Sequence, residues 1–240
     1  MSTELPSDAP PTRTKGEWGI PEVIGWFVAA YVVTTLVVVA VGSGHRGEVG
    51  RGSGLAPRQL VVAAVVLPTT FLLAVAWALR RRTHRPAEEV LQFSDRPGRD
   101  LFHGVLIGLG LQVGLALFFS VFRLPSEQGV QDDLKSLVGF QRGAFAAFAA
   151  VAAPVAEEMF FRVLLLDALR RRLPVVVAVL AQGLLFGLVH YSSTTAWPVV
   201  AALAVVGIVL GTVFARGRSI WTCVAAHMAF NALAVVQLIG

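Results

Sequence analysis

Six polar or ionisable side chains stand out because they lie inside long apolar stretches of this 240-residue chain. They are Glu157, Glu158, Arg162, His190, His227 and Asn231. An ionisable side chain at bilayer depth costs at least about 2.5–3.5 kcal/mol on insertion scales, so such residues usually face a bundle interior and have a function. Histidine, carboxylate and amide groups from separate segments are the groups needed to hold and activate a water or a divalent metal ion.

The two adjacent glutamates differ in their access to a local cation. Glu158 and Arg162 are four residues apart, so one helical turn brings carboxylate and guanidinium together, and the pair can enter a low-dielectric site nearly neutral. Glu157 points roughly 100° away, because a turn takes 3.6 residues. It is left without an obvious local cation, and we predict that it is a general base. The alternative is an ion-pair cluster that only holds helices together.

The two histidines have a less specific pattern when each is taken alone. A single histidine in an apolar helix is more often a hydrogen-bonded packing residue than a ligand. His190 ends one apolar run, however, and His227 lies within a later run with Asn231 one turn on. Two histidines, an amide and a carboxylate pair on three apolar segments favour a shared site.

The composition shows what kind of element must position these residues. Hydrophobic residues make up 55% of the chain and charged residues 15%, with a mean hydropathy of +0.70. This balance excludes a water-soluble globule and a disordered chain. The net charge of +5 comes from basic clusters between apolar runs, which is typical of a membrane protein and does not indicate nucleic-acid binding. The single cysteine, Cys223, excludes an intrachain disulfide.

About 20 apolar residues are needed to cross a bilayer as a helix, and several segments meet that requirement. The predicted spans are 21–41, 60–79, 101–122, 174–190, 198–215 and 219–239, with a seventh at 143–169 that contains the glutamates. This last segment is either one long tilted helix or a span followed by an eighth short helix. Long unbroken runs exclude a transmembrane barrel. We therefore predict an all-α, polytopic transmembrane helical bundle of seven or eight spans in contact with the lipid bilayer.

The lysines and arginines predict the orientation of the bundle. Thirteen fall on the side that holds the N-terminus and six on the other, and Arg162 lies within a span. The richer side is expected to be cytosolic, so the prediction is a multi-pass plasma-membrane protein with a cytosolic N-terminus. Residues 1–19 are expected to form a disordered tail, 20–125 accessory helices and 126–240 the catalytic core. A short interfacial helix is predicted within 127–142.

Three motifs of the chain resemble those of a known family in order and approximate separation. Glu157-Glu158-x-x-x-Arg162, Phe186-x-x-x-His190 and His227-x-x-x-Asn231 are similar to the motifs of the CPBP intramembrane proteases. That family includes the type II CAAX prenyl endopeptidases and the bacterial Abi proteins, and the similarity covers roughly residues 140–240. The resemblance implies hydrolysis of peptide bonds in membrane-associated peptides or proteins, either prenylated CAAX-type or bacteriocin-like.

The resemblance also implies a role for each residue. Glu157 would be the general base on a water, His190 would help to position that water, and His227 with Asn231 would stabilise the oxyanion. Glu157, His190 and His227 are candidate ligands for one divalent metal such as zinc, and a metal-free glutamate mechanism fits the sequence equally well.

Two other functions use the same residues. A proton- or cation-coupled transporter could use them as a relay, and would need a polar path to both membrane faces. A non-catalytic scaffold or immunity protein would keep the fold without using the site. One feature fits the predicted spans badly, since His227 lies ~12 Å and His190 ~24 Å from the cytosolic starts of their spans. Helix tilt or an earlier start would be needed to bring them level.

Overall fold

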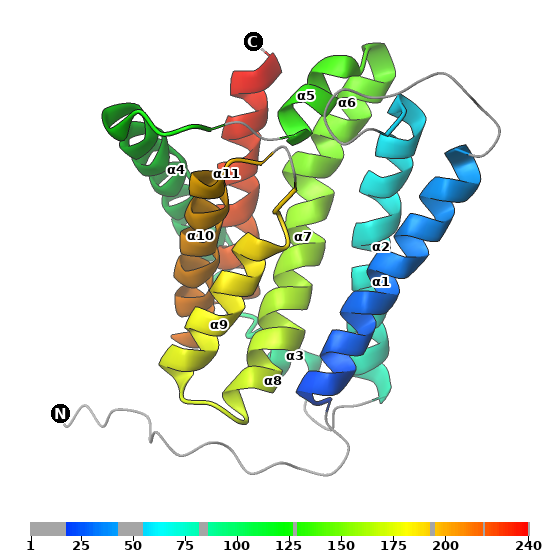
Figure 1. Ribbon diagram of the computed structural model, residues 1–240. Helices are drawn as coiled ribbons and strands as arrows, with labels where there is room; N and C mark the ends of the chain where they lie inside the picture. Colours follow the sequence, from blue (N-terminus) through cyan, green and yellow to red (C-terminus); the bar gives the residue numbers. More distant parts are fainter. Residues whose placement is uncertain are drawn as a thin grey trace.

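The computed structural model describes residues 18–42, 55–81, 86–126, 129–192, 195–217 and 219–239, and these residues are helical with short connections (Figure 1). The predicted tail at 1–19 lies outside the described residues except for Trp18 and Gly19. The elements are α1 (Ile20–Gly42), α2 (Pro57–Arg81), α3 (Ala87–Leu91), α4 (Pro97–Phe122), α5 (Gly129–Ser136), α6 (Gly139–Ala147), η1 (Phe148–Ala152), α7 (Ala153–Glu158), η2 (Met159–Leu166), α8 (Asp167–Arg170), α9 (Val175–Leu188), α10 (Trp197–Ala215) and α11 (Ile220–Ile239).

Within the described residues, five helices are long and apolar enough to cross a membrane: α1, α2, α4, α10 and α11. The prediction of an all-α polytopic bundle is therefore confirmed. α9 is also apolar but has only 14 residues, so it ends before the predicted span boundary at 190. The short helix predicted within 127–142 is present as α5, residues from Gly139 onward belong to the next helix, and the interfacial position of α5 stays a prediction.

The segment that carries the glutamates is one continuous helical run from Gly139 to Arg170, rather than a span followed by a separate short helix. It contains two π-helical segments, η1 and η2, in which the backbone hydrogen bonds reach one residue further than in an α-helix. Pro154 is the second residue after the end of η1 and has no N–H to donate, so it interrupts the α-helical ladder at this point. The run passes through the bundle beside α2 and α9 (Figure 1).

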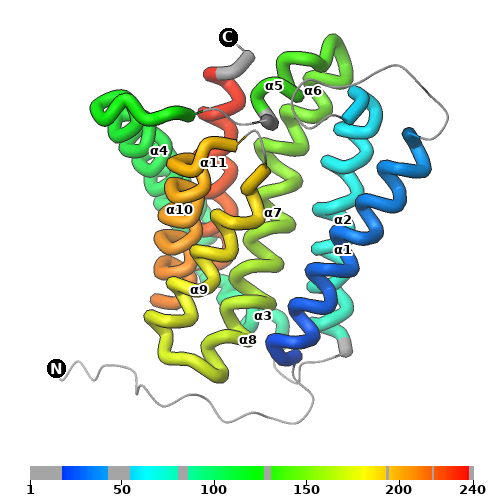
Figure 2. Tube along the Cα trace, in the orientation of Figure 1, coloured from blue at the N-terminus to red at the C-terminus, as the bar shows by residue number. Residues whose placement is uncertain are grey.

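Glycines allow two pairs of helices to approach closely. A Cβ added at Gly108 of α4 would lie 2.0 Å from the carbonyl oxygen of Ala226 in α11. A Cβ at Gly187 of α9 would lie 2.5 Å from the carbonyl oxygen of Val200 in α10. Small residues at such contacts are typical of helix packing in membranes. The trace in Figure 2 shows both pairs side by side. His227 on α11 is buried.

The two ends of the bundle differ in charge. At one end, which we call the basic end, α2 and α8 finish, α3 lies, and α4, α9 and α11 begin (Figure 1). Seven basic residues with described side chains lie there: Arg80, Arg96, Arg99, Arg170, Arg171, Arg172 and Arg216. Four lie at the opposite end, near α5: Arg58, Arg123, Lys135 and Arg142. α1 also begins at the basic end.

Candidate active site

A buried ion pair forms the base of the site. The Nε of Arg162 lies 2.7 Å from one oxygen of Glu158, and its Nη2 lies 3.0 Å from the other. Both side chains are 0% exposed. The remaining terminal nitrogen of Arg162 donates to the side-chain oxygen of Gln182 at 2.6 Å. The two contacts form a bidentate ion pair between the guanidinium and the carboxylate, as the spacing of four residues predicts.

His227 is held by the same carboxylate. Its Nδ1 lies 2.9 Å from Oε1 of Glu158, and the side chain is 4% exposed. Because a carboxylate paired with arginine accepts hydrogen bonds, Nδ1 carries the hydrogen in this contact. In the neutral imidazole the other nitrogen, Nε2, is then an acceptor that faces away from the ion pair.

His190 is fixed in the same way by a different acceptor. Its Nδ1 lies 2.7 Å from the carbonyl oxygen of Phe186, so that nitrogen donates and Nε2 is the acceptor. The ring of Phe186 is fully buried and packs against both imidazoles, with its centroid 5.0 Å from that of His190 and 5.5 Å from that of His227. The buried ring therefore limits the orientations that both imidazoles can adopt.

Glu157 is the residue at which these groups converge. Its Oε2 lies 3.9 Å from Nε2 of His190 and 3.8 Å from Nε2 of His227. The side chain is 21% exposed, in contrast to the fully buried Glu158. Separations above 3.5 Å are too long for a direct hydrogen bond, and a water between two such groups can hydrogen-bond to both. The site thus presents three acceptors to a common region at the edge of a cavity.

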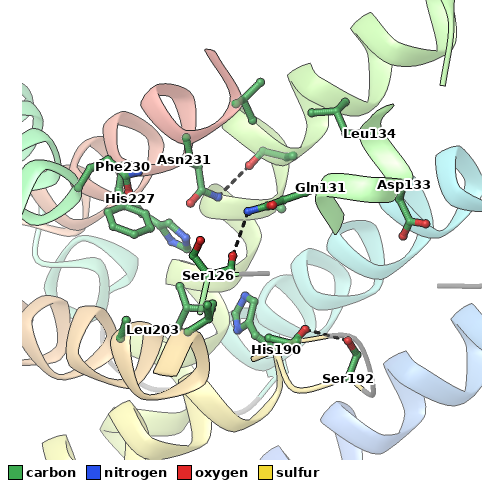
Figure 3. Close-up of a pocket in the computed structure, with 18 of the residues that line it drawn as sticks. Ser126, Gln131, Asp133, Leu134, His190, Ser192, Leu203, His227, Phe230 and Asn231 are labelled. Atoms are coloured by element: carbon green, nitrogen blue, oxygen red, sulfur yellow. Dashed lines mark hydrogen bonds between the residues drawn. The ribbon is translucent and has the colours of Figure 1, made fainter. Parts of the chain in front are cut away.

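Asn231 lies one turn beyond His227 on α11 and also lines the cavity. Its side-chain nitrogen donates to the carbonyl oxygen of Ala149 in η1 at 2.9 Å (Figure 3). An amide nitrogen carries two hydrogens, so one remains for another acceptor. The carbonyl of Ala149 is in the π-helical segment, where an i to i+5 pattern changes which backbone oxygens are paired.

The cavity above the site has a volume of about 1120 Å³ and extends toward the end of the bundle that holds α5. Glu157, His190, His227 and Asn231 lie on its wall, whereas Glu158 and Arg162 are behind it. Figure 3 shows His190 and His227 facing the same space, with Ser126 and Gln131 further along the cavity. Apolar side chains such as Leu203 and Phe230 form much of the remaining wall.

The structure therefore brings the six residues singled out in the sequence into two adjoining layers. Glu158 and Arg162 form a sealed layer, and the other four residues face the cavity. Gln182 also belongs to the sealed layer. None of the three motifs contains it, and the only sign of its role in the sequence is that an amide side chain lies within an apolar run. Its own nitrogen donates to the carbonyl oxygen of Gly207 in α10 at 3.4 Å.

The depth mismatch between His190 and His227 is resolved by helix tilt. α9 begins lower in the view of Figure 1 than α10 ends, and it leans across the bundle. His190 lies in the turn that follows α9 rather than within a helix. Because α9 starts lower and is tilted, it rises less per residue along the bundle axis than an upright helix. The imidazole of His190 therefore lies at the level of His227 on α11.

The candidate metal ligands do not have metal-ligand spacing. Ligands at 2.0–2.1 Å from a tetrahedral zinc lie about 3.3 Å apart, which is shorter than the separations of Glu157 from both imidazoles. Among the described residues, no group of three or more histidines, cysteines, aspartates or glutamates is arranged to hold a metal ion.

Comparison with known proteins finds a family match in the second half of the chain. Residues 140–233 match the family model of the type II CAAX prenyl endopeptidases, Rce1-like, over somewhat less than half of the chain. No curated protein and no solved structure shows a significant match. The matched segment begins one residue after the start of α6 and ends two residues after Asn231, so it contains the three motifs. Residues 140–233 are therefore similar to the Rce1-like type II CAAX prenyl endopeptidases, and this match confirms the resemblance seen in the three motifs.

Proposed function

We propose that this protein is an intramembrane endopeptidase that hydrolyses peptide bonds of membrane-associated substrates with a water activated by Glu157. The observation that carries the proposal is the difference in environment between the two adjacent glutamates. Glu158 is neutralised by Arg162 and fully buried, while Glu157 faces the cavity with Nε2 of both imidazoles within 3.9 Å. A carboxylate with neighbouring acceptors and no paired cation is suited to remove a proton from water.

A single water can occupy the space among these acceptors. It has two hydrogens to donate, one to Oε2 of Glu157 and one to an imidazole nitrogen. Its oxygen lone pairs are then directed into the cavity, where a scissile carbonyl would lie. Such positioning removes much of the entropic cost of bringing the nucleophile to its target.

The reaction that follows balances without a further reactant. The water oxygen forms a bond to the carbonyl carbon as its proton passes to Glu157, which gives a tetrahedral intermediate with a negative oxygen. The carbon–nitrogen bond then breaks, and the proton held by Glu157 passes to the leaving nitrogen. His190 holds the water in line, since its own Nδ1 is fixed on the carbonyl oxygen of Phe186.

Asn231 supports the developing charge in this proposal. One of its amide hydrogens is used on the carbonyl oxygen of Ala149, which fixes the direction of the other. A fixed donor aimed at a developing oxyanion contributes about 2.7–4 kcal/mol in comparable hydrolases. His227, when protonated at Nε2, supplies a second donor from the same helix.

The transport alternative receives less support from the packing. A relay needs polar groups that continue to both faces of the membrane. On the basic-end side of the site, the sealed layer of Glu158, Arg162 and Gln182 is packed among buried apolar side chains such as Phe160, Phe161 and Leu164. The cavity extends only toward the opposite end along its described lining.

The decisive experiment replaces the basic oxygen while keeping the shape of the side chain. Purified Glu157→Gln is compared with the parent on a panel of membrane peptides, with Glu89→Gln on the exposed face of α3 as a matched control. We expect cleavage to fall by about 10²–10⁴-fold in Glu157→Gln and to be unchanged in the control. Equal cleavage by parent and Glu157→Gln, or no cleavage by the parent, would instead favour a non-catalytic scaffold.

A further inference from the structure

The cavity has a definite polarity along the bundle. Its walls continue from Glu157 toward the ends of α4 and α11 and toward α5, where Gln112, Ser126 and Gln131 lie on them. Gln131 donates to the carbonyl oxygen of Ser126 at 3.3 Å, which joins α5 to the connection that precedes it (Figure 3). Ser126 is exposed, so the described lining reaches solvent at this end.

The opposite direction is filled by packed side chains. Phe160 and Phe161 follow Glu157 toward the basic end and are each 1% exposed. Cys223 and Ile220, which precede His227 on α11, are 0% exposed. A peptide that approached from the basic end would have to displace this core, whereas one that approached from the α5 end would meet an existing cavity.

The charge distribution indicates which compartment each end faces. Seven basic residues with described side chains lie at the basic end and four at the α5 end. The end of a membrane protein that is richer in lysine and arginine is the cytoplasmic one. The open end of the cavity is therefore on the extracytoplasmic side.

We infer that the site takes its substrate from the extracytoplasmic side of the membrane: an exported or membrane-anchored polypeptide whose scissile bond lies among apolar residues just inside the outer leaflet. This inference rests on the proposed protease function. The apolar side chains of the wall, among them Leu67, Phe148 and Phe230, match apolar residues that flank the scissile bond. The glutamines at the rim match the polar backbone of an extended segment as it enters. A lipidated tail presented from the cytosol would reach the packed face instead.

Labelling tests the side without relying on catalysis. Cys223 is the only cysteine and is fully buried, so the parent should not react with a membrane-impermeant maleimide. Ser126→Cys places a thiol at the open end, and Glu89→Cys places one at the basic end, where the native side chain is also exposed. On intact cells we expect label on Ser126→Cys, and label on Glu89→Cys only after lysis. The reverse pattern would overturn the inference.

Cleavage tests the substrate class. One apolar peptide cassette is fused to either the extracytoplasmic or the cytoplasmic side of a single-span anchor and expressed with the parent or with Glu157→Gln. We expect the parent to cut only the extracytoplasmic reporter, and the variant to lose that product. Cleavage of the cytoplasmic reporter overturns the inference. If neither reporter is cut while the label follows the expected pattern, the protease function fails, and the measured orientation of the cavity stands apart from that failure.

Discussion

The loss of stability on removing the Arg162 guanidinium can be estimated from the structure. Arg162→Met would leave the Glu158 carboxylate, 0% exposed, with His227 as its remaining described partner, and would leave the oxygen of Gln182 without its donor. Breaking a buried ion pair on one side costs about 3–5 kcal/mol, because an uncompensated charge stays in a low-dielectric site. That loss corresponds to roughly 10²–10⁴-fold in the unfolding equilibrium.

The assay is a denaturant titration in mixed micelles, followed for the parent, each single variant and the double variant. Glu158→Gln alone should cost a similar amount, since it leaves the guanidinium unpaired. The double variant Glu158→Gln/Arg162→Met should be destabilised by at least about 2 kcal/mol less than the sum of the single variants. Arg99→Met, on an exposed side chain of α4, is the control and should change stability by less than about 0.5 kcal/mol.

The titration also has an outcome that would refute the reasoning. A cost below about 1 kcal/mol for Arg162→Met is what a solvent-exposed ion pair gives. That result would mean that Glu158 and Arg162 are hydrated, and the contrast between a sealed Glu158 and an available Glu157 would lose its basis. Additive single variants would lead to the same conclusion.

Two further predictions concern packing and metal. Gly108→Ala should destabilise the fold by about 1–3 kcal/mol, because its Cβ would lie 2.0 Å from the carbonyl oxygen of Ala226, whereas Gly110→Ala on the same helix meets nothing within 4 Å and should be tolerated. Equal stabilities in the same titration would contradict the close approach of α4 and α11. Chelator treatment should leave peptide cleavage unchanged and elemental analysis should find metal far below one ion per chain, since Glu157 and the two imidazoles lack ligand spacing. Loss of cleavage that added zinc restores would show that the side chains close around a metal.

The spans were largely predictable because one local property decides them. An apolar run of about 20 residues can cross a bilayer only as a helix, and the runs in this chain are long. The end of α9 was placed too late because hydropathy does not register where a helix stops. At that end the imidazole of His190 donates a hydrogen bond to the carbonyl oxygen of Phe186, one of the backbone groups that a helix terminus leaves unpaired. This hydrogen bond does not alter the hydropathy of the sequence, so a hydropathy pattern cannot reveal it.

The site was predictable in composition and less so in arrangement. The pairing of Glu158 with Arg162, and the different direction of Glu157, follow from 3.6 residues per turn within a single helix. The hydrogen bonds from Gln182 to Gly207 and from Asn231 to Ala149 join helices that are distant in sequence. Contacts of this kind depend on helix tilt and axial register, which local periodicity does not encode. The roles of the individual residues stay predictions until the variants are measured.

The sealed layer connects the stability of the bundle to its chemistry. Glu158 and Arg162 lie on the central run, Gln182 on α9 and His227 on α11, so one buried hydrogen-bonded network joins three passes of the chain. Because His227 Nδ1 is fixed on Glu158, any movement of the ion pair also moves the imidazole that faces Glu157. A displacement of about 1 Å at such a site can lower a rate by about 10²-fold. The double variant, which removes both charges and is destabilised by less than the sum of the single variants, should therefore still cleave poorly where it folds, since its neutral glutamine holds the imidazole less firmly.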